Sequence, residues 1–163
     1  APELSAAQPA AAELPAAPEL PAQQLRATMP QPLPAGLLDL LRKPSPCFVA
    51  TLMPDGSPQL TETWVHTDGE HIVLNIVGGS QKDRNLARDP RVAINVADPD
   101  DIRRFYAIRG RVAATTSEGG HESIHEISQK YLGMPYPYFS GNPDETRLIL
   151  TIEADRITAP PGE

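Results

Sequence analysis

The residues best suited to chemistry lie in one segment, 78–96, with the sequence GGSQKDRNLARDPRVAINV. Its first two residues, both glycine, allow a tight turn because they carry no Cβ. Ser80 is suited to cap a following helix and to leave the first backbone N–H groups free for an anion. Lys82 and Arg84 add positive charge, so the pattern predicts a phosphate-binding helix start. A capped surface helix with solvated cations has the same features, and the segment alone leaves both interpretations open.

The charge distribution favours a small anionic ligand. The chain has 14 Lys and Arg against 21 Asp and Glu, a net charge of −7. Nucleic-acid-binding proteins present an excess of Lys and Arg to the phosphates, so the acidic balance argues against that class. The basic residues are instead concentrated in segments 82–91 and 103–111, and the second contains no acid. Two local cationic patches on an acidic protein indicate a small anion as ligand.

The metal-ligand pattern HESIH at 121–125 is weak in its context. It matches H-E-x-x-H, in which two histidines on one helical face bind zinc. A glycine pair directly before His121 puts that histidine at the helix start, where packed turns do not hold it. Glu145, a candidate third ligand, lies in a loop rich in Pro and Gly. Ile124 and Ile127 explain the helix as a packing element, so we predict no metal site.

The single cysteine, Cys47, excludes an internal disulfide and a cysteine-based zinc cluster within one chain. It lies in the apolar run 47–52. We therefore expect a buried, unreactive thiol.

Composition divides the chain into an arm, one folded domain and a tail. Residues 1–34 consist largely of Ala and Pro and repeat the pieces APEL and AELP. Prolines interrupt helices and central strands, so we expect this arm to be disordered. It lacks the cationic start and apolar core of a secretory signal, and no segment approaches the roughly 20 apolar residues that span a bilayer. We therefore expect a cytoplasmic protein with no membrane contact, one domain over 35–158 and a tail over 159–163.

Periodicity and turn residues predict mostly strands in the domain. Helices are expected at 35–42, 80–88 and 118–132, the second ending at the Asp89-Pro90 pair. Turns are expected at Asp55-Gly56 and Asp68-Gly69. The expected strands are 47–53, 59–66, 71–77, 92–97, 105–115 and 148–152. Six mostly antiparallel strands with two or three flanking helices indicate a small β-barrel of the α+β class.

The order of these pieces resembles one family, the split β-barrel flavin and deazaflavin oxidoreductases of the pyridoxamine-phosphate-oxidase-like superfamily. The similarity is greatest to its F420-dependent branch and covers residues 37–158. The segments that carry it are ATLMPDGSPQLTETW, GGSQKDRNLARDPRVA, RFYAIRGRV and SIHEISQKYLGMPYPY. Histidine is frequent in such proteins at the position of His125, which further weakens the zinc interpretation.

The resemblance implies a homodimer with two cofactor sites at the subunit interface. The positions that match its phosphate-binding residues are Gly79, Ser80, Gln81, Lys82, Arg84 and Asn85. Those that match the strand along the cofactor ring are Thr61, Glu62, Thr63 and Trp64, and Asn95 is a weaker contact. Trp64 is equally suited to a plain core position. Arg103 and Arg104 either bind the anionic tail of the deazaflavin or are solvated.

The implied reaction is hydride transfer from reduced coenzyme F420 to a conjugated acceptor such as an enone, quinone, nitroaromatic or tetrapyrrole. No residue stands out as the catalytic acid; His66, Tyr136 and solvent are open alternatives. Tyr136 and Tyr138 are expected either at the mouth of the site or at the dimer edge. FMN in place of F420 is an alternative, and a non-catalytic protein that carries F420 is another.

Overall fold

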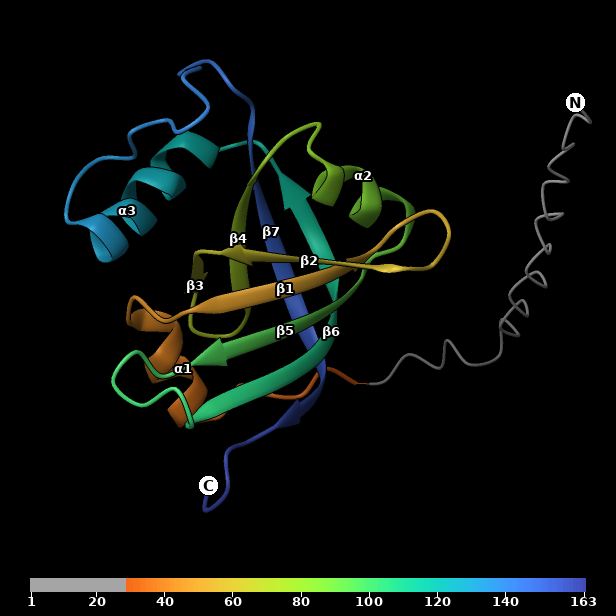
Figure 1. The fold of residues 1–163 in the computed structure, drawn as a ribbon, viewed down its shortest axis with the longest axis vertical. Coiled ribbons are helices and arrows are strands. Elements are labelled where there is room, and N and C mark those ends of the chain that lie inside the picture. Colours follow the sequence, from red (N-terminus) through yellow and green to blue (C-terminus); the bar gives the residue numbers. More distant parts are fainter. Residues whose placement is uncertain (1–28) are drawn as a thin grey trace, which may run out of the picture.

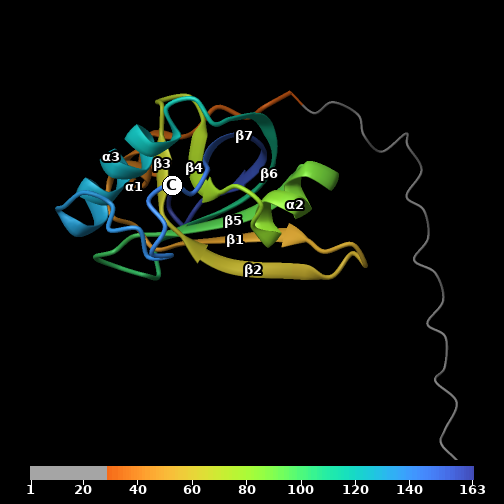
Figure 2. The same cartoon turned by 90° about the horizontal axis from the view of Figure 1, so that it is seen from above.

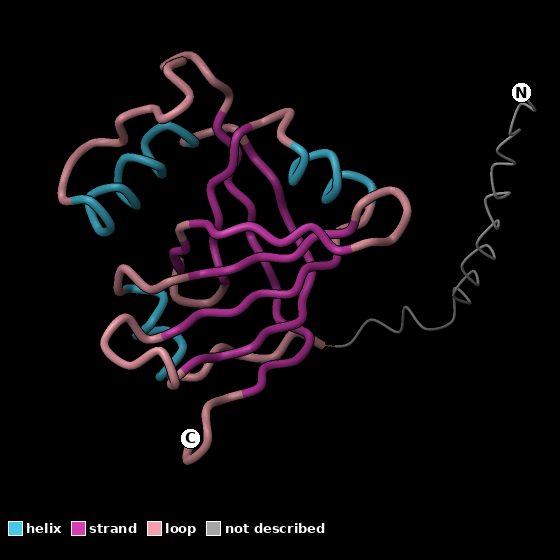
Figure 3. The backbone as a smooth tube through the Cα atoms, viewed as in Figure 1, coloured by secondary structure: helices cyan, strands magenta, loops and turns pink. Residues whose placement is uncertain are grey.

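The computed structural model describes residues 29–163, so the first 28 residues of the predicted arm lie outside it. Three helices and seven strands make up this part of the chain (Figures 1 and 3). In order they are α1 (Ala35–Arg42), β1 (Cys47–Leu52), β2 (Pro58–Thr63), β3 (Val65–Thr67), β4 (Ile72–Val77), α2 (Gln81–Arg88), β5 (Arg91–Ala97), β6 (Phe105–Thr116), α3 (Gly120–Leu132) and β7 (Arg147–Thr158). The predicted α+β class is confirmed.

The strands form one antiparallel sheet in the order β2-β1-β5-β6-β7-β4-β3. Seen from above, the sheet curls so that β1, β2 and β5 form one wall and β4, β6 and β7 the other (Figure 2). The edge strands β2 and β3 follow one another in the chain but do not pair with each other. The result is a half-barrel that is split where β2 ends and β3 begins.

The split corrects the predicted strand count from six to seven. Residues 59–66 were expected to form one strand, but Thr63 is the last residue of β2 and pairs with Cys47, whereas Val65 already pairs with Leu74 of β4. The strand changes partner at Trp64. No glycine or proline marks the change, and strand-forming residues lie on both sides of it, so the sequence pattern continues through the break.

The inner face of the curled sheet is the core, and α1 closes one end of it. Leu37, Leu40 and Leu41 are fully buried and lie on one face of this helix at spacings of three and four. A second helix, α3, lies beside the break between β2 and β3. It is tied to α1 by Lys130, whose Nζ donates to Leu41 O at 2.7 Å. Tyr131 Oη donates to Ser45 O at 2.7 Å and accepts the N–H of Val65 at 3.2 Å. These bonds fix the position of α3 beside the break.

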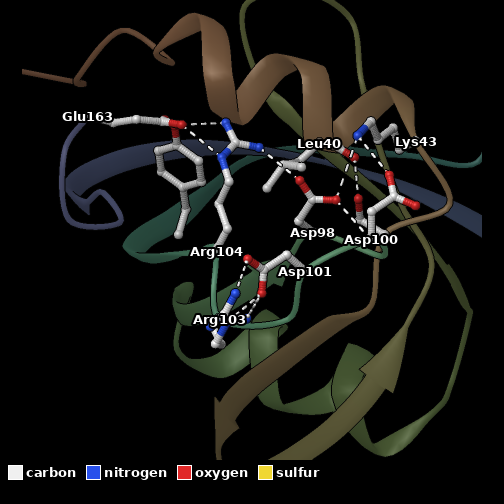
Figure 4. Close-up of polar contacts among 10 residues, drawn as sticks. Leu40, Lys43, Asp98, Asp100, Asp101, Arg103, Arg104 and Glu163 are labelled. Carbon is white, nitrogen blue, oxygen red and sulfur yellow. Dashed lines mark hydrogen bonds and ion pairs between the residues drawn. The ribbon is translucent and has the colours of Figure 1, made fainter.

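Segments at both ends of the described chain contact the domain. Gln31, in the predicted arm, donates its N–H to Ala154 O at 2.7 Å and accepts the N–H of Ile157 on its side chain at 2.9 Å. In the tail, the carboxylate of Glu163 binds Arg104 and the hydroxyl of Tyr106 (Figure 4). Arg104 also binds Asp98, and Arg103 binds Asp101. Both arginines that were considered for the cofactor tail therefore have carboxylate partners within the chain.

Candidate functional site

Two adjoining cavities lie at the split in the barrel. The lysine cavity, of about 290 Å³, lies between β2, β4 and the start of α2, and is lined by Gln59, Thr61, Thr63, Asn75, Ile76, Val77, Ser80, Gln81, Lys82 and Arg147. The aromatic cavity, of about 550 Å³, is lined by Pro44, Ser45, Pro46, Glu62, Thr63, Trp64, Asn75, Ile124, Tyr131, Tyr136, Phe139 and Arg147. Thr63, Asn75 and Arg147 line both. One ligand is therefore able to occupy both cavities.

The start of α2 forms one wall of the lysine cavity. Ser80 caps the helix as predicted: its hydroxyl accepts the N–H of Asp83 at 3.3 Å, and the Asp83 carboxylate accepts the N–H of Gly79 at 2.7 Å. Gly79 has a φ of 75°, which favours glycine. The backbone N–H groups of Gln81 and Lys82 have no acceptor within residues 29–163, as expected in a first helical turn. Free N–H groups at a helix start attract anions.

Lys82 provides the positive charge of this cavity. Its half-buried ammonium takes part in no hydrogen bond or ion pair with the part of the chain that the structure describes. Burial lowers its pKa below the ordinary lysine value. The buried Oγ1 of Thr61 is also without a partner among these residues. Unpaired buried donors are costly unless a ligand or water completes them, so the lysine cavity suits an oxyanion.

Two further residues predicted to bind phosphate, Arg84 and Asn85, are hydrogen-bonded within the chain. Arg84 is exposed, and its guanidinium donates to Gly79 O at 2.5 Å and to the side chain of Gln81 at 2.7 Å. Asn85 is fully buried, and its amide nitrogen donates to Thr51 Oγ1 at 3.0 Å and to Gln59 Oε1 at 3.1 Å. Neither lines either cavity. Asn85 holds α2 against β1 and β2, and Arg84 ties the start of α2 to the preceding turn.

An aromatic cluster walls the larger cavity. Trp64 stacks on Tyr131 with ring centroids 5.1 Å apart and planes 10° apart. Tyr136 and Phe139 meet the same indole edge-on, at 5.9 and 6.2 Å. Trp64 thus packs in a cluster and lines the site as well. Lys130 Nζ lies 4.9 Å from the Tyr131 ring centroid, and burial lowers its pKa to about 8.

The two histidines of the H-E-x-x-H pattern hold the loop that carries Tyr136. His125 Nδ1 accepts the N–H of Tyr136 at 3.0 Å, so its proton is on Nε2, which lies 3.3 Å from Tyr138 Oη. Tyr138 Oη lies 3.1 Å from His121 Nδ1. Within residues 29–163 no group of three or more His, Cys, Asp or Glu side chains is placed to hold a metal ion. His66, another residue considered as a proton donor, lines neither cavity.

Two residues where the cavities meet, Arg147 and Asn75, are not among those predicted from the sequence. The Arg147 side chain is 5 % exposed and forms an ion pair with Glu145 at 2.8 Å. Its Nε donates to Asn75 Oδ1 at 2.8 Å, and Asn75 Nδ2 donates to Gly120 O at 2.7 Å. A Cβ on Gly120 would lie 2.2 Å from Arg147 O, so this glycine is required for the close approach of α3. Asn75 lies inside an apolar run and Arg147 directly before one, so neither stood out.

Asn95 lies on the other side of the sheet. It lines an outer-face groove of about 340 Å³ together with Phe48, Ala50, Leu60, Ala93, Ile94, Ala107, Ile108, Arg109, Arg156 and Thr158. Phe48 is 38 % exposed and Leu60 67 %. Asn95 is thus separated from the two cavities within one chain.

Together, the split barrel, the lysine cavity and the adjoining aromatic cavity are suited to a ligand with an anionic end and a flat apolar end. Comparison with known proteins agrees with this class. The profile of the family described as pyridoxamine 5′-phosphate oxidase matches residues 33–159, and the chain belongs to that family. The resemblance to its superfamily of flavin and deazaflavin oxidoreductases is thereby confirmed.

Solved structures show the same fold. An F420 reductase is 28 % identical, with a TM-score of 0.65 and coverage of 77 % of this chain and 98 % of its own. A conserved hypothetical protein from Mycobacterium tuberculosis is 29 % identical, with a TM-score of 0.60 and coverage of 81 % and 86 %. A protein described as a putative pyridoxamine 5′-phosphate oxidase from Listeria innocua is 18 % identical, with a TM-score of 0.58 and coverage of 76 % and 94 %, and supports the fold alone. The search of curated proteins gives no match. Among residues 29–163 no helix is long and apolar enough to cross a membrane.

Proposed function

We propose that this protein is a reductase that uses reduced coenzyme F420 to deliver a hydride to a conjugated small molecule. The observation that carries the proposal is the pair of adjoining cavities, one with the unpaired ammonium of Lys82 and the other with the aromatic cluster around Trp64. The similarity to an F420 reductase supports the choice of cofactor. Enones, quinones, nitroaromatics and tetrapyrroles are the acceptor classes that this chemistry serves.

The residues present fit such a cofactor. Lys82, Thr61 and the first N–H groups of α2 would hold its phosphate, since all are donors without partners among the described residues. Thr63 and Trp64, with Glu62 beside them, would line its ring system. When bound, the reduced deazaflavin supplies the hydride. The aromatic cluster would exclude water and hold the acceptor. Of the proton donors considered, Tyr136 lines the aromatic cavity, so Tyr136 and solvent are the candidates there.

We also propose that the active form is a homodimer joined through the outer face of β2, β1, β5 and β6. The sheet register brings the half-exposed Phe48 beside Asn95 and the exposed Leu60 beside Ala50. An apolar patch of this kind favours a protein partner. Glu62 lies opposite Phe48 on this face and also lines the aromatic cavity. A partner subunit on the outer face would therefore reach the cofactor site, and Asn95 would contact the cofactor from there.

The experiment identifies the bound chromophore and then tests the reaction. The full chain is produced in a host that makes both F420 and FMN, and the extracted chromophore is identified by mass spectrometry. The reduced chromophore is then mixed with a panel of conjugated acceptors, with and without protein. The proposal predicts F420 and faster reoxidation with protein present. FMN alone would support an FMN-dependent oxidoreductase of the same family, and bound F420 with no acceleration for any acceptor would favour a carrier protein.

A further inference from the structure

We infer that Arg147 binds the cofactor where the two cavities meet, by donating hydrogen bonds to an uncharged carbonyl or hydroxyl oxygen of it. This inference rests on the proposed function and extends it to a residue outside the predicted phosphate segment. Arg147 lines both cavities, and its side chain is 5 % exposed. A ligand that extends from Lys82 to Trp64 must therefore pass its guanidinium.

The guanidinium has donors to spare. Of its five N–H groups, Nε donates to Asn75 Oδ1 at 2.8 Å and Nη1 donates once to Glu145 Oε1 at 2.8 Å. Nη2 has one long contact with Asn75 O at 3.4 Å. One N–H on each terminal nitrogen thus has no acceptor within residues 29–163. Buried donors of a charged group are costly to leave unpaired, so a ligand oxygen at this point is favoured.

The orientation of Arg147 is fixed before any ligand binds. Its partner Glu145 is equally buried and accepts a second bond, from Ser140 Oγ at 2.5 Å. Asn75 is anchored to Gly120 O, and the guanidinium carbon lies 5.0 Å from the ring centroid of Tyr136. The four contacts of Arg147, with Asn75 Oδ1, Asn75 O, Glu145 and the Tyr136 ring, leave its side chain little freedom to lose on binding. The planar fork of arginine is suited to directional recognition, in contrast to the point charge of Lys82.

Charge balance decides which part of the ligand Arg147 contacts. Its positive charge is compensated by Glu145 at 2.8 Å, whereas Lys82 has no carboxylate partner in the described chain. The phosphate therefore favours Lys82, and the neutral Arg147–Glu145 pair favours an oxygen without full charge. Both F420 and FMN have ribityl hydroxyls between the phosphate and the ring, and carbonyl oxygens on the ring, so either cofactor offers the acceptor.

The test compares Arg147→Lys, which keeps the charge but loses the fork, with Lys82→Ala and the wild type. Each protein is titrated with F420, FMN and inorganic phosphate, which is small enough to fill only the lysine cavity. We expect Arg147→Lys to weaken binding of the preferred cofactor about tenfold, the loss of one or two hydrogen bonds, and to leave phosphate binding unchanged. Lys82→Ala should weaken both. Unchanged cofactor affinity in Arg147→Lys would overturn the inference, and an equal loss of phosphate binding would show that Arg147 serves the anion instead.

The wild type supplies a separate readout if Arg147→Lys does not fold. In nitrogen NMR spectra, the Nη–H signals of Arg147 should shift and become protected from solvent exchange when the cofactor is added. No change in these signals on saturation would overturn the inference while leaving the proposed function intact. Failure of the wild type to bind either cofactor would instead contradict the proposed function, and the inference with it.

Discussion

Replacing Lys82 by alanine should separate ligand binding from folding. The ammonium of Lys82 is half-buried, has no partner in the described chain, and has a pKa lowered by burial. It therefore stabilises neither an ion pair nor a hydrogen-bond network in the free protein. Its removal should cost binding free energy without a matching loss of stability.

The expected magnitude follows from the loss of one charge-assisted hydrogen bond. Such bonds contribute about 1.5 to 3 kcal/mol, and about 1.4 kcal/mol corresponds to a factor of ten in Kd. Lys82→Ala should therefore raise the Kd for F420 by roughly 10- to 150-fold. Binding is not abolished, because Thr61 and the N–H groups at the start of α2 remain. The free energy of unfolding should change by less than about 1 kcal/mol, as for substitutions that break no network.

The assay is an equilibrium fluorescence titration, paired with urea unfolding of the same samples. Arg91→Ala is the matched control, because it also removes one positive charge. The guanidinium of Arg91 is paired with Asp89 at 2.6 Å, and Arg91 lines neither the two cavities nor the outer-face groove. The control should bind F420 as the wild type does. Equal affinity in Lys82→Ala and Arg91→Ala would refute the phosphate assignment, and a large loss of stability in Lys82→Ala would show that the lysine is structural.

Three further predictions concern the surroundings of the site. His125→Ala removes the hydrogen-bond acceptor of the Tyr136 N–H. The KM for the substrate that receives the hydride should rise several-fold, and the free energy of unfolding should fall by about 1 kcal/mol, with F420 affinity unchanged. An unchanged KM would argue against a role of His125 in positioning Tyr136. Phe48→Glu should give a monomer in analytical ultracentrifugation and weaken F420 binding. The control Leu132→Glu changes an exposed residue at the end of α3 and should leave the dimer intact. If Phe48→Glu is still a dimer, the interface lies elsewhere. Burial lowers the pKa of Lys130 to about 8, below the value of about 10.4 for an unfolded lysine, so the unfolded chain binds more protons between these two pH values. Between them, urea unfolding should show that the stability of the wild type rises with pH relative to that of Lys130→Met. Parallel pH profiles of the two proteins would contradict the lowered pKa.

The sequence predicts those parts of the fold that depend on local signals. The bounds of α1 match the prediction, because a leucine face and the flanking prolines define it within ten residues. The strand change at Trp64 depends instead on which strands lie beside it, and this information is distributed along the chain. The last strand also runs further than the predicted 148–152, to Thr158. Its charged residues Glu153 and Asp155, which lie beyond the predicted end of the strand, both pair with Arg111 of β6 across the sheet.

The same distinction applies to the site. The sequence indicates Ser80 and Lys82, which line the lysine cavity, because a turn, a cap and a charge follow each other directly in the chain. Arg147 reaches the site because β7 pairs with β4, which brings it opposite Val77 at the end of that strand. A single buried arginine next to an apolar run gives no local sign of its partners. Candidate residues placed by local backbone geometry are thus predictable from the sequence, and those brought together by the sheet are not.

The central claim is that the lysine cavity holds the phosphate of F420 while the ring occupies the aromatic cavity. The most direct measurement is a titration of the full chain with F420 and with FMN side by side, repeated in the presence of inorganic phosphate. The claim predicts tighter binding of F420 than of FMN and competition by phosphate. Tight FMN binding without F420 binding, or F420 binding that phosphate does not weaken, would contradict it.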